Sequence, residues 1–564
     1  MIQNFLAYFL RRRRTSSEID PDEIFLDSSN LPQFDNDQFE GRIESPIKMG
    51  TVISVGAFFI ILVIVFLSRS WYLQVQKGSF YFEKSEKNSL RHSMVFAERG
   101  IVSDRLGKLL AWNTVNPGSD DFALRSYTLE SGMAHILGYL KYPQKDKQGF
   151  YFQKEFVGKD GIEKQYEQLI TGENGLKIVE TDALGAVVSE STIDSPESGT
   201  NIRLSIDSRV QHKLFESMVS TANQVGFKGG GAVIMDVHTG EILAMTSFPE
   251  YSSQIMTDGG NSKAIGEWLT SKQTPLVNRV VSGLYTPGSI VKPYVALAAL
   301  SEGTISPNKQ IISTGSISVP NPYNPELKTV FNDWKAHGAV DMRRAIAVSS
   351  NVYFYTVGGG YGDQKGVGIS NLEKYYKMFG FGEETGIDVP GEVVGIVPSP
   401  EWKKKNFNGE DWRIGDTYYT SIGQYGFQLT PISAVRAVAA IANEGVLLTP
   451  HILLDGKERV VKNIPIKNEY FKIIKEGMRL GALEGTGSAL NIKGVEIATK
   501  TGTAELGVSK ETVNSWATGF FPYKNPKYAF AIVMEKGSRN NLVGSVYVLK
   551  QLFEWMAIYT PEYF

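Results

Sequence analysis

Residues 285–300 have the sequence YTPGSIVKPYVALAAL, which indicates a tight turn followed by an apolar helix over Ile290–Ser301. Ser289 stands at the N-terminal turn of that helix, where free backbone N–H groups favour developing negative charge. Lys292 follows three residues later, and residues i and i+3 share one helix face, so its amine can reach the Ser289 hydroxyl. A lysine can activate a serine if burial or a second cation lowers its pKa. The stretch predicts a serine acyl-transfer centre, and an ordinary helix cap is the alternative.

The Ser-x-x-Lys spacing is weak evidence alone, because it also occurs at Ser45–Lys48 and Ser306–Lys309. Neither of those copies opens an apolar helix after a tight turn. A second short motif, Ser349-Ser350-Asn351, follows the predicted helix Met342–Val348. A serine hydroxyl there could relay a proton towards a leaving group, and the Asn351 amide could bind a substrate carbonyl. A helix-terminus cap is the alternative for this motif.

The third motif, Lys500-Thr501-Gly502-Thr503, occurs once and follows an apolar stretch. On an edge strand its backbone could add a peptide as a further strand, with Gly502 allowing a close approach. The hydroxyls of Thr501 and Thr503, with the Lys500 charge, suit a terminal carboxylate. Lys500 could also be the second cation that lowers the pKa of the catalytic amine. The alternative is a β-turn with an exposed lysine, but the three motifs in this order favour catalysis.

Composition excludes several other kinds of chemistry. The 564 residues are enough for several structural units, and 42 % of them are apolar. With 58 Lys and Arg against 60 Asp and Glu, the chain lacks the basic field of a nucleic-acid-coating protein. Zero Cys excludes thiolate nucleophiles and zinc-thiolate sites, and six scattered His leave little material for a His-based metal centre. There is no phosphate-binding Gly-x4-Gly-Lys loop. We therefore expect no cofactor and no metal.

One segment has the composition of a membrane span. Met49–Ser68 contains twenty residues without a charge, enough to cross roughly 30 Å, and Trp71 and Tyr72 follow where an interfacial aromatic belt would lie. A buried core helix is the alternative. The basic run Arg11–Arg14 favours a cytoplasmic N-terminus, whereas the charges closest to the span favour the opposite orientation. Charge alone does not decide which side the large domain faces.

The remaining pattern predicts four regions. Residues 1–48 form a tail whose stretch Glu18–Glu40 is acidic and largely disordered, either simply solvated or a docking segment. Residues 49–68 form the transmembrane helix, residues 69–200 a first unit beyond the span that ends in a Pro/Ser/Gly linker, and residues 201–564 an α/β domain. In that last domain, strands that bracket helices predict a sheet sandwiched by helices.

The expected elements are named by their ranges. A short helix is predicted at Glu163–Leu169, and longer helices at Asp207–Ala222, Met342–Val348, Pro431–Asn443 and Val548–Tyr559. Strands are predicted at Gly231–Met235, Glu241–Ser247, Ala517–Phe521 and Tyr528–Glu535, the first two as a hairpin.

With these motifs in place, the chain resembles the class B penicillin-binding proteins, the peptidoglycan transpeptidases, over its anchor and nearly all of residues 69–564. Beyond the three short motifs, five stretches follow family phrases: Arg99–Gly107, Gly161–Gly172, Thr385–Glu392, Thr430-Pro431 and Asn525–Ala529. Asp333-Trp334-Lys335, with His337-Gly338, favours the cell-elongation branch. The resemblance implies a membrane-anchored α/β protein. Its transpeptidase domain would resemble a serine β-lactamase, with a central antiparallel sheet and helices, on an elongated α+β pedestal, or dimerisation, domain.

The resemblance also implies a role for each motif residue. Ser289 would be the acyl-accepting nucleophile and Lys292 its base, while Ser349 would relay the proton to the leaving D-alanine. Asn351 would hold the donor stem peptide, and Lys500 with Thr501 would support its carboxylate and the proton network. The N–H groups of Ser289 and Thr503 would form the oxyanion hole. An amine from a neighbouring strand would resolve the acyl-enzyme into a cross-link, and β-lactams would trap Ser289 covalently.

Family topology places the tail in the cytoplasm and the catalytic domain outside the cytoplasmic (inner) membrane. The implied partners are peptidoglycan stem peptides, a RodA-like glycosyltransferase and an MreC-like protein at the pedestal, with no nucleic acid. Two departures stand out. The family phrase Gly-Gln-Gly is Gly423-Gln424-Tyr425-Gly426 here, and the Cys-containing metal site of some relatives is not carried over.

Two other functions remain open on the sequence. One is a β-lactamase or carboxypeptidase that passes the acyl group to water, although a lactamase would be short, soluble and without the pedestal. The other is a non-catalytic β-lactam sensor or scaffold, whose signature would be the loss of a motif; none is lost here.

Overall fold

The structure is a computed structural model that describes residues 48–81, 90–118, 121–147, 151–181, 187–321, 324–507, 510–541 and 543–564. The tail predicted over residues 1–48, including its acidic stretch Glu18–Glu40, lies outside these residues except for Lys48. The described residues fall into two compact units. One runs from the N-terminal helix to Leu90 and includes residues 180–188, and the other comprises Arg91–Val179 and Ser189–Phe564.

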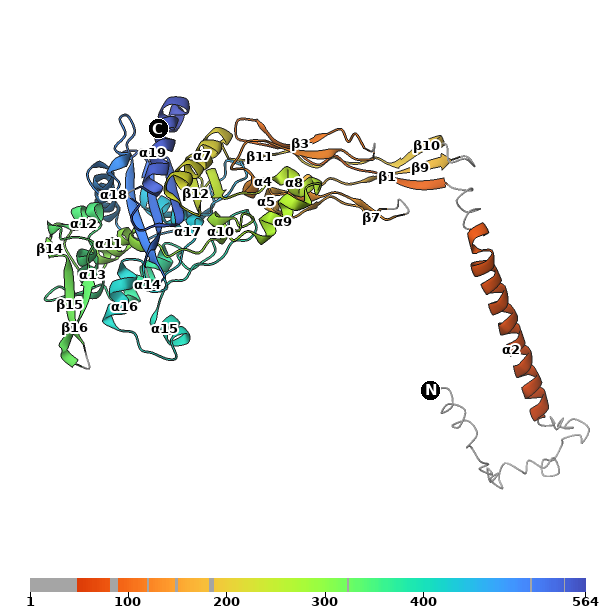
Figure 1. Cartoon of the computed structure of the whole chain (residues 1–564), viewed down its shortest axis with the longest axis horizontal. Coiled ribbons are helices and arrows are strands. Elements are labelled where there is room, and N and C mark those ends of the chain that lie inside the picture. The colour runs from red at the N-terminus through yellow and green to blue at the C-terminus, as the bar shows by residue number, and fades with distance from the viewer. Residues whose placement is uncertain are drawn as a thin grey trace, which may run out of the picture. The chain divides into compact units, whose positions relative to one another are not determined.

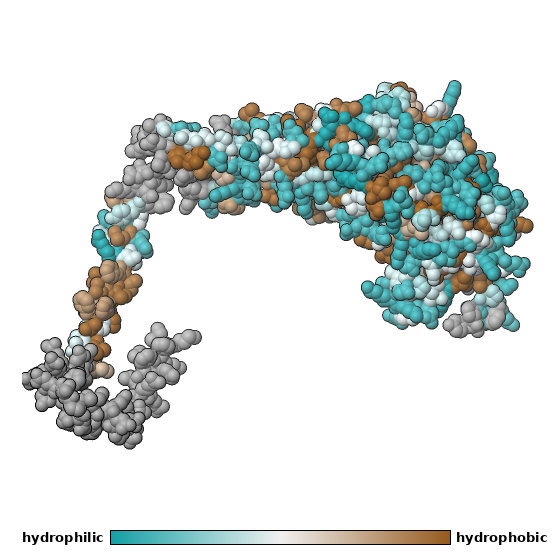
Figure 2. Space-filling model, turned by 180° about the vertical axis from the view of Figure 1, so that it is seen from behind, coloured by the Kyte–Doolittle hydropathy of each residue, from teal (hydrophilic) through white to brown (hydrophobic). Residues whose placement is uncertain are grey.

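The first unit contains helix α2 (Met49–Trp71), which continues directly into the π-helical turn η3 (Tyr72–Gln76). Its sequence is mostly Val, Ile, Leu and Phe, and no charged residue occurs between Lys48 and Arg69. None of its residues is buried, and its surface is mostly hydrophobic in Figure 2. The combined helix is long and apolar enough to cross a membrane.

The N-terminal part of the second unit is built from short strands in four small sheets. Their orders are β1-β9-β10, β11-β2-β3-β4, β5-β8 and β6-β7. The strands are β1 (Leu90–Val95), β2 (Val102–Ser103), β3 (Leu109–Thr114), β4 (Leu124–Tyr127), β5 (Leu140–Lys141), β6 (Gln144–Lys145), β7 (Tyr151–Gln153), β8 (Val157–Gly158), β9 (Gly175–Thr181), β10 (Val187–Asp194) and β11 (Ile202–Arg203). Three short helices lie among them: α4 (Ala134–Leu137), α5 (Gly161–Gln165) and α6 (Glu167–Ile170).

A buried charge cluster joins strand β4 and helix α5 to the loop between β1 and β2. The Glu163 carboxylate accepts from Arg99 Nε at 2.5 Å and from Arg125 Nε at 2.8 Å, and all three side chains are 1 % exposed. Two guanidinium groups thus share one carboxylate, and Glu167 supplies a second negative charge with its Oε1 3.1 Å from Arg99 Nη1. In place of the single helix expected over Glu163–Leu169, the structure has two short helices, α5 and α6. They are separated at Tyr166, whose hydroxyl donates to Asp388 Oδ2 at 2.5 Å.

The centre of the second unit is a five-stranded sheet in the order β13-β12-β22-β21-β20. Every neighbouring pair is antiparallel. The strands are β12 (Gly229–Asp236), β13 (Ile242–Phe248), β20 (Ala498–Leu506), β21 (Thr512–Phe521) and β22 (Tyr528–Ser538). The predicted hairpin is confirmed as β12 and β13, and the other two predicted strands are confirmed and longer than expected. The predicted edge strand is confirmed as β20.

Helices cover both faces of this sheet (Figure 1). On one face, α7 (Ser208–Val225) and α19 (Ser545–Tyr559) pack together and against the strands. On the other, α17 (Pro431–Ala442) packs across β12, β21 and β22. The predicted helices at 207–222, 431–443 and 548–559 are thus confirmed within a few residues, and so is the sheet sandwiched by helices.

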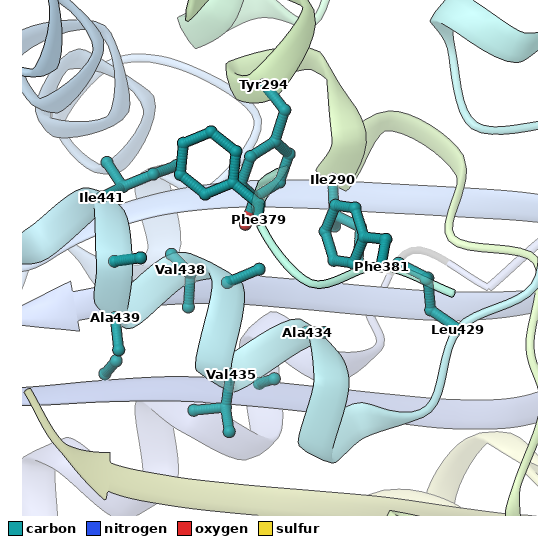
Figure 3. Packing of buried hydrophobic residues seen from close by; sticks show 14 of the residues in the cluster. Ile290, Tyr294, Phe379, Phe381, Leu429, Ala434, Val435, Val438, Ala439 and Ile441 are labelled. Carbon is teal, nitrogen blue, oxygen red and sulfur yellow. The ribbon is translucent and has the colours of Figure 1, made fainter. Parts of the chain in front are cut away.

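Helix α17 is buried along its whole length, because its sequence PISAVRAVAAIA presents small apolar residues on every side. Figure 3 shows Ile441 of this helix near aromatic side chains that include Phe379 and Tyr294. Since Tyr294 lies on the helix that follows Ser289, this core positions the predicted nucleophile relative to the sheet.

The remaining elements surround that core. The helices are α8 (Ser253–Asp258), α9 (Ser262–Thr270), α10 (Arg279–Ser282), α11 (Lys292–Ser301), α12 (Met342–Val348), α13 (Asn351–Gly359), α14 (Ile369–Met378), α15 (Pro400–Asn406), α16 (Ile414–Ser421) and α18 (Asn468–Leu483). The short 3-10 turns are η4 (Gly288–Val291), η5 (Ser488–Leu490) and η6 (Pro561–Tyr563). The outer strands form three pairs: β14 (Ile311–Ser313) with β17 (Gly338–Val340), β15 (Ser316–Asn321) with β16 (Asn324–Asn332), and β18 (Val446–Leu448) with β19 (Val460–Asn463).

Candidate active site

The turn before Ser289 is held tightly against the sheet edge. Gly288 has φ +58°, a region that favours glycine, and its N–H donates to Gly423 O at 2.9 Å. A Cβ at Gly288 would lie 2.8 Å from Thr503 O, so a side chain has no room there. Ser289 therefore lies in a 3-10 turn beside strand β20, and its side chain is half-buried.

The predicted helix Ile290–Ser301 begins as this 3-10 turn and becomes α-helical at Lys292. In a 3-10 turn, side chains three residues apart eclipse one another, so Ser289 and Lys292 share a face. The Lys292 amine donates to Ser349 O at 2.7 Å, to Asn351 Oδ1 at 2.7 Å and to Ser349 Oγ at 3.2 Å. Among the described residues, the Ser289 hydroxyl is not one of its hydrogen-bond partners. Catalytic hydrogen bonds commonly tighten only when substrate binds.

Burial lowers the pKa values of both lysines of the site. Lys292 is fully buried, and this burial lowers the pKa of its amine to about 7, although the nearby Asp333 carboxylate opposes the shift. Lys500 is 1 % exposed, and burial together with the charge of Lys292 holds its pKa well below the ordinary value. A neutral amine is thus accessible near neutral pH, as a general base requires.

Ser349 connects the two lysines. It ends helix α12 in the left-handed region, with φ +59°, which turns its side chain out of the helix. The Ser349 hydroxyl accepts from Lys500 Nζ at 2.9 Å as well as from Lys292. The helix-cap role considered for this motif belongs to Ser350, whose hydroxyl accepts from Tyr353 N at the start of α13. Residues 292, 349, 351 and 500 therefore form one hydrogen-bonded cluster.

The Lys500–Thr503 motif lies within strand β20 at the edge of the sheet. The β-turn alternative is wrong, since Lys500 is buried and its amine faces Ser349. The Thr501 hydroxyl lies 2.6 Å from that of Thr486, and Thr503 is exposed. A Cβ at Gly502 would lie 2.7 Å from Pro287 O, so glycine is needed here for contact with the nucleophile's own turn. That Gly502 also makes room for a substrate backbone stays a prediction.

Asp333 organises the Ser349–Asn351 segment. Its Oδ2 accepts from Ser350 Oγ at 2.8 Å, from Val352 N at 2.9 Å and from Ser313 Oγ at 3.1 Å. Its side chain is fully buried and lies 3.6 Å from His337 Nε2. In the sequence, Asp333 is recognisable only as part of the family phrase Asp333-Trp334-Lys335. Other charged residues, such as Lys328 and Lys335, lie close to it along the chain, so the local pattern does not reveal what it binds.

The additional residue Tyr425 has a structural explanation. It has φ +64°, and its ring stacks on Phe407 and meets Trp402 and Trp412 edge-on. Gly426 beside it is equally restricted, because a Cβ there would lie 2.3 Å from the Trp402 ring. The aromatic cluster thereby connects the 402–412 segment to the loop whose Gly423 accepts from the active-site turn.

A family model described as the penicillin-binding protein transpeptidase domain matches residues 230–554, which include all the motif residues above. A second model, for the penicillin-binding protein dimerisation domain, matches residues 120–204. The chain is a class B penicillin-binding protein. The family resemblance noted from the motifs and the expected fold class are confirmed.

This penicillin-binding protein has relatives of known identity and known structure. It is 31 % identical over 504 residues to the peptidoglycan D,D-transpeptidase MrdA of Escherichia coli, covering 82 % of this chain and 77 % of that one. It is similar to Pseudomonas aeruginosa PBP2 in complex with WCK 5153, with 30 % identity, a TM-score of 0.68, and coverage of 83 % and 97 %. It is also similar to Helicobacter pylori PBP2 in its complex with MreC, with 27 % identity, a TM-score of 0.67, and coverage of 83 % and 99 %.

Proposed function

We propose that this chain is a membrane-anchored peptidoglycan D,D-transpeptidase of cell elongation that cross-links stem peptides through an acyl-enzyme on Ser289. The single observation that supports this most strongly is the Ser349 hydroxyl, which accepts from the amines of both Lys292 and Lys500. Two buried lysines with lowered pKa values lie around Ser349. One of them can act as the base for Ser289, and the Ser349 hydroxyl provides a route for the proton that the base removes. The relationship to transpeptidases named for D,D-peptide chemistry indicates the substrate class.

In the first step, neutral Lys292 takes the proton of Ser289 Oγ as that oxygen attacks the carbonyl between the two terminal D-alanines. The negative charge that develops on the carbonyl oxygen is stabilised by the N–H groups of Ser289 and Thr503. The C–N bond then breaks, and the departing amine of D-alanine receives a proton through Ser349. The products are an ester on Ser289 and free D-alanine.

Substrate binding is assigned to the groups that line the same sheet edge. The donor peptide adds to β20 as a further strand, in the manner of β-strand addition. Asn351 holds its backbone, Lys500 and Thr501 bind its terminal carboxylate, and the Gly502–Thr503 backbone lies alongside. A β-lactam, which is similar to the dipeptide terminus, occupies the same position and acylates Ser289.

In the second step, the amine of a neighbouring stem peptide attacks the ester carbonyl and loses a proton to Lys292. The ester C–O bond breaks, and Lys292 returns that proton to Ser289 Oγ. The result is a cross-link with no net consumption of nucleotide. This matches a catalytic domain on the outer side of the membrane, where α2 is the anchor and residues 1–48 lie in the cytoplasm.

The proposed surroundings follow from the same assignment. The protein resides in the inner membrane as a single-pass protein, with a pedestal over residues 69–200 and a transpeptidase domain over residues 201–564. An MreC-like protein is a proposed partner at the pedestal, since the related Helicobacter pylori PBP2 forms a complex with MreC. A RodA-like glycosyltransferase is the proposed partner that supplies the glycan strands.

The test is mass spectrometry of the full chain after labelling with penicillin. Because Lys292 precedes Pro293, trypsin does not cut between them and leaves Ser289 in the peptide Val280–Lys309. This peptide also contains Ser306, the serine of the Ser306–Lys309 copy of the Ser-x-x-Lys spacing. Fragmentation must place the adduct on Ser289 and not on Ser306. Labelling should vanish in Ser289→Ala and persist in Ser306→Ala; an adduct elsewhere would refute the assignment.

A second measurement separates the alternative functions. A transpeptidase should keep the penicillin adduct for a long time and transfer a stem-peptide acyl group to an added D-amino acid. Turnover of penicillin within seconds to minutes would favour a hydrolase. If Ser289→Ala fully sustained cell shape and cross-linking, the scaffold function would replace the enzymatic one.

A further inference from the structure

A second cluster of titratable side chains shares none of the residues of the site described above. Glu241 lies in the turn between β12 and β13, and His451 and Asp455 lie after β18. Glu241 and His451 are neighbours in an isolated parallel bridge. One ligand atom from each of the three side chains lies within 4.8 Å of the others. Residues 210 positions apart thus bring one imidazole and two carboxylates together.

The imidazole of His451 lacks a partner on one side. The ring is completely buried, and its Nδ1 lies 3.2 Å from Thr449 O. A carbonyl only accepts, so Nδ1 must carry the hydrogen in this bond. Within the described part of the chain, Nε2 has no hydrogen-bond partner, and it lies 3.7 Å from Asp455 Oδ1. When the His451 ring is neutral, the lone pair of Nε2 therefore faces Asp455 Oδ1. Neither atom carries a hydrogen, so no hydrogen bond can form between them.

Both carboxylates are oriented by other groups. Asp455 Oδ2 accepts from Arg459 at 2.9 Å, while Oδ1 accepts from Lys457 N at 3.1 Å and lies towards His451. Glu241 Oε1 accepts from Gly456 N at 3.2 Å. Hydrogen bonds of this kind, including one from the second nitrogen of the histidine to a carbonyl, are the usual outer support of protein metal ligands.

We propose that Glu241, His451 and Asp455 bind one divalent transition-metal cation of the Zn²⁺ class. An imidazole nitrogen with two carboxylate oxygens suits Zn²⁺, whereas Mg²⁺ and Ca²⁺ prefer oxygen ligands alone. Arg459 lies near Asp388 as well as Asp455, so with a neutral imidazole the carboxylates of Glu241, Asp455 and Asp388 and this guanidinium sum to two negative charges, which a divalent ion balances.

The ion would be structural. Its ligands join the β12–β13 turn to the loop after β18, and that loop is already attached through Asp388, which accepts from Ile452 N at 2.7 Å. Asp388 also accepts from Tyr166 on the pedestal side of the unit. Binding would therefore stabilise the contact between the β12–β13 hairpin and this loop. It would take no part in the reaction at Ser289.

The test uses the detergent-solubilised full chain after chelator treatment, titrated with ZnCl₂ by calorimetry and followed by its melting temperature. His451→Gln and Asp455→Asn should each weaken the proposed site at least about tenfold and abolish the zinc-dependent rise in melting temperature. His238→Gln removes an imidazole from the same turn as Glu241 but outside the cluster, and it should bind zinc like the wild type. Penicillin acylation should persist in the zinc-free protein.

Co²⁺ in place of Zn²⁺ adds a spectroscopic readout, because its visible bands should change between wild type and His451→Gln. If the buried histidine variant fails to fold, Asp455→Asn answers the question alone, since Asp455 is partly exposed. Equal zinc uptake in both ligand variants and the wild type would overturn the proposal. So would a wild-type protein that binds no zinc, including one in which a protonated His451 pairs directly with the carboxylates.

Discussion

Lys292 and Lys500 donate to one and the same oxygen, the hydroxyl of Ser349, at 3.2 Å and 2.9 Å. Both amines are buried, so two positive charges at this spacing would repel each other without much screening by water. The protonation of one lysine therefore disfavours the protonation of the other, and the pair titrates as a unit. Ser349 is the only oxygen that both amines share among the described residues, which makes it the natural route for a proton between them.

The first prediction concerns the base. Lys292→Ala should lower the second-order rate constant of penicillin acylation by roughly 10²-fold or more, because proton removal from Ser289 loses its acceptor. Lys309→Ala, in the Ser306–Lys309 copy of the Ser-x-x-Lys spacing, is the matched control and should acylate normally. Fluorescent-penicillin labelling with circular dichroism checks both rate and fold; normal labelling of Lys292→Ala would contradict the assignment.

The second prediction is the pH dependence of the wild type. Burial lowers the pKa of Lys292 to about 7, so the amine is charged and inactive below that pH and neutral above it. The acylation rate should rise with pH through about 7 and then level off. Stopped-flow measurement with a chromogenic β-lactam tests this. A rate that is flat from pH 5 to 9, or that falls with rising pH, would exclude a neutral amine as the base.

The third prediction uses the left-handed conformation of Ser349. Ser349→Ala and Ser349→Gly both remove the shared hydroxyl, and both should lose acylation to the same extent. Only glycine adopts this backbone region without strain, so Ser349→Gly should be about 1 kcal/mol more stable than Ser349→Ala. Urea unfolding of the two variants measures the difference. Normal acylation in either one would exclude Ser349 from proton transfer.

The fourth prediction concerns Asp333, whose charge raises the pKa of Lys292 against the larger effect of burial. Asp333→Asn removes that charge, so the pKa of Lys292 should fall further and the rising limb of the pH–rate profile should move to lower pH. The plateau should also drop, because Asn has one acceptor oxygen where Asp333 has two, so either Trp334 N or the donors of Ser350 and Val352 lose their acceptor. The loss of these buried hydrogen bonds should cost about 1–3 kcal/mol of stability.

Asp341→Asn is the control for this experiment. Asp341 caps helix α12 through the Arg344 N–H, outside the Lys292 cluster, so its loss should cost up to about 1 kcal/mol and leave the midpoint of the profile unchanged. An Asp333→Asn profile with the wild-type midpoint would mean that this carboxylate acts on the fold alone.

The fifth prediction tests the contact between the nucleophile's turn and strand β20. Gly502→Ala would place a Cβ 2.7 Å from Pro287 O, which forces the turn away from the strand. We expect a loss of about 1–3 kcal/mol in stability and a large fall in acylation. Gly260→Ala is the control, since a Cβ there meets nothing within 4 Å. If both variants acylate equally well, the close approach has no catalytic importance.

Local elements could be read from the sequence with good accuracy where one pattern dominated. Helix α12 lies at the predicted bounds Met342–Val348, and the β12–β13 hairpin lies where two apolar runs on either side of the turn Val237–Gly240 predicted it. The prediction failed at Glu163–Leu169, because a tertiary hydrogen bond from Tyr166 to Asp388 accompanies the break in that helix. No local pattern contains the partner of such a bond.

The amino-acid order alone established which residue types are available: a serine with a lysine one turn later, a second lysine before a glycine, an apolar span, and no cysteine. Those are properties of neighbouring residues, and spacing along a helix or strand determines them. Only the tertiary structure decided that Lys292 directs its amine to Ser349 and Asn351, that Asp333 holds their segment, and that His451 meets Glu241 and Asp455. These contacts join residues tens to hundreds of positions apart, and they form because burial of the apolar core brings the polar groups to the same place.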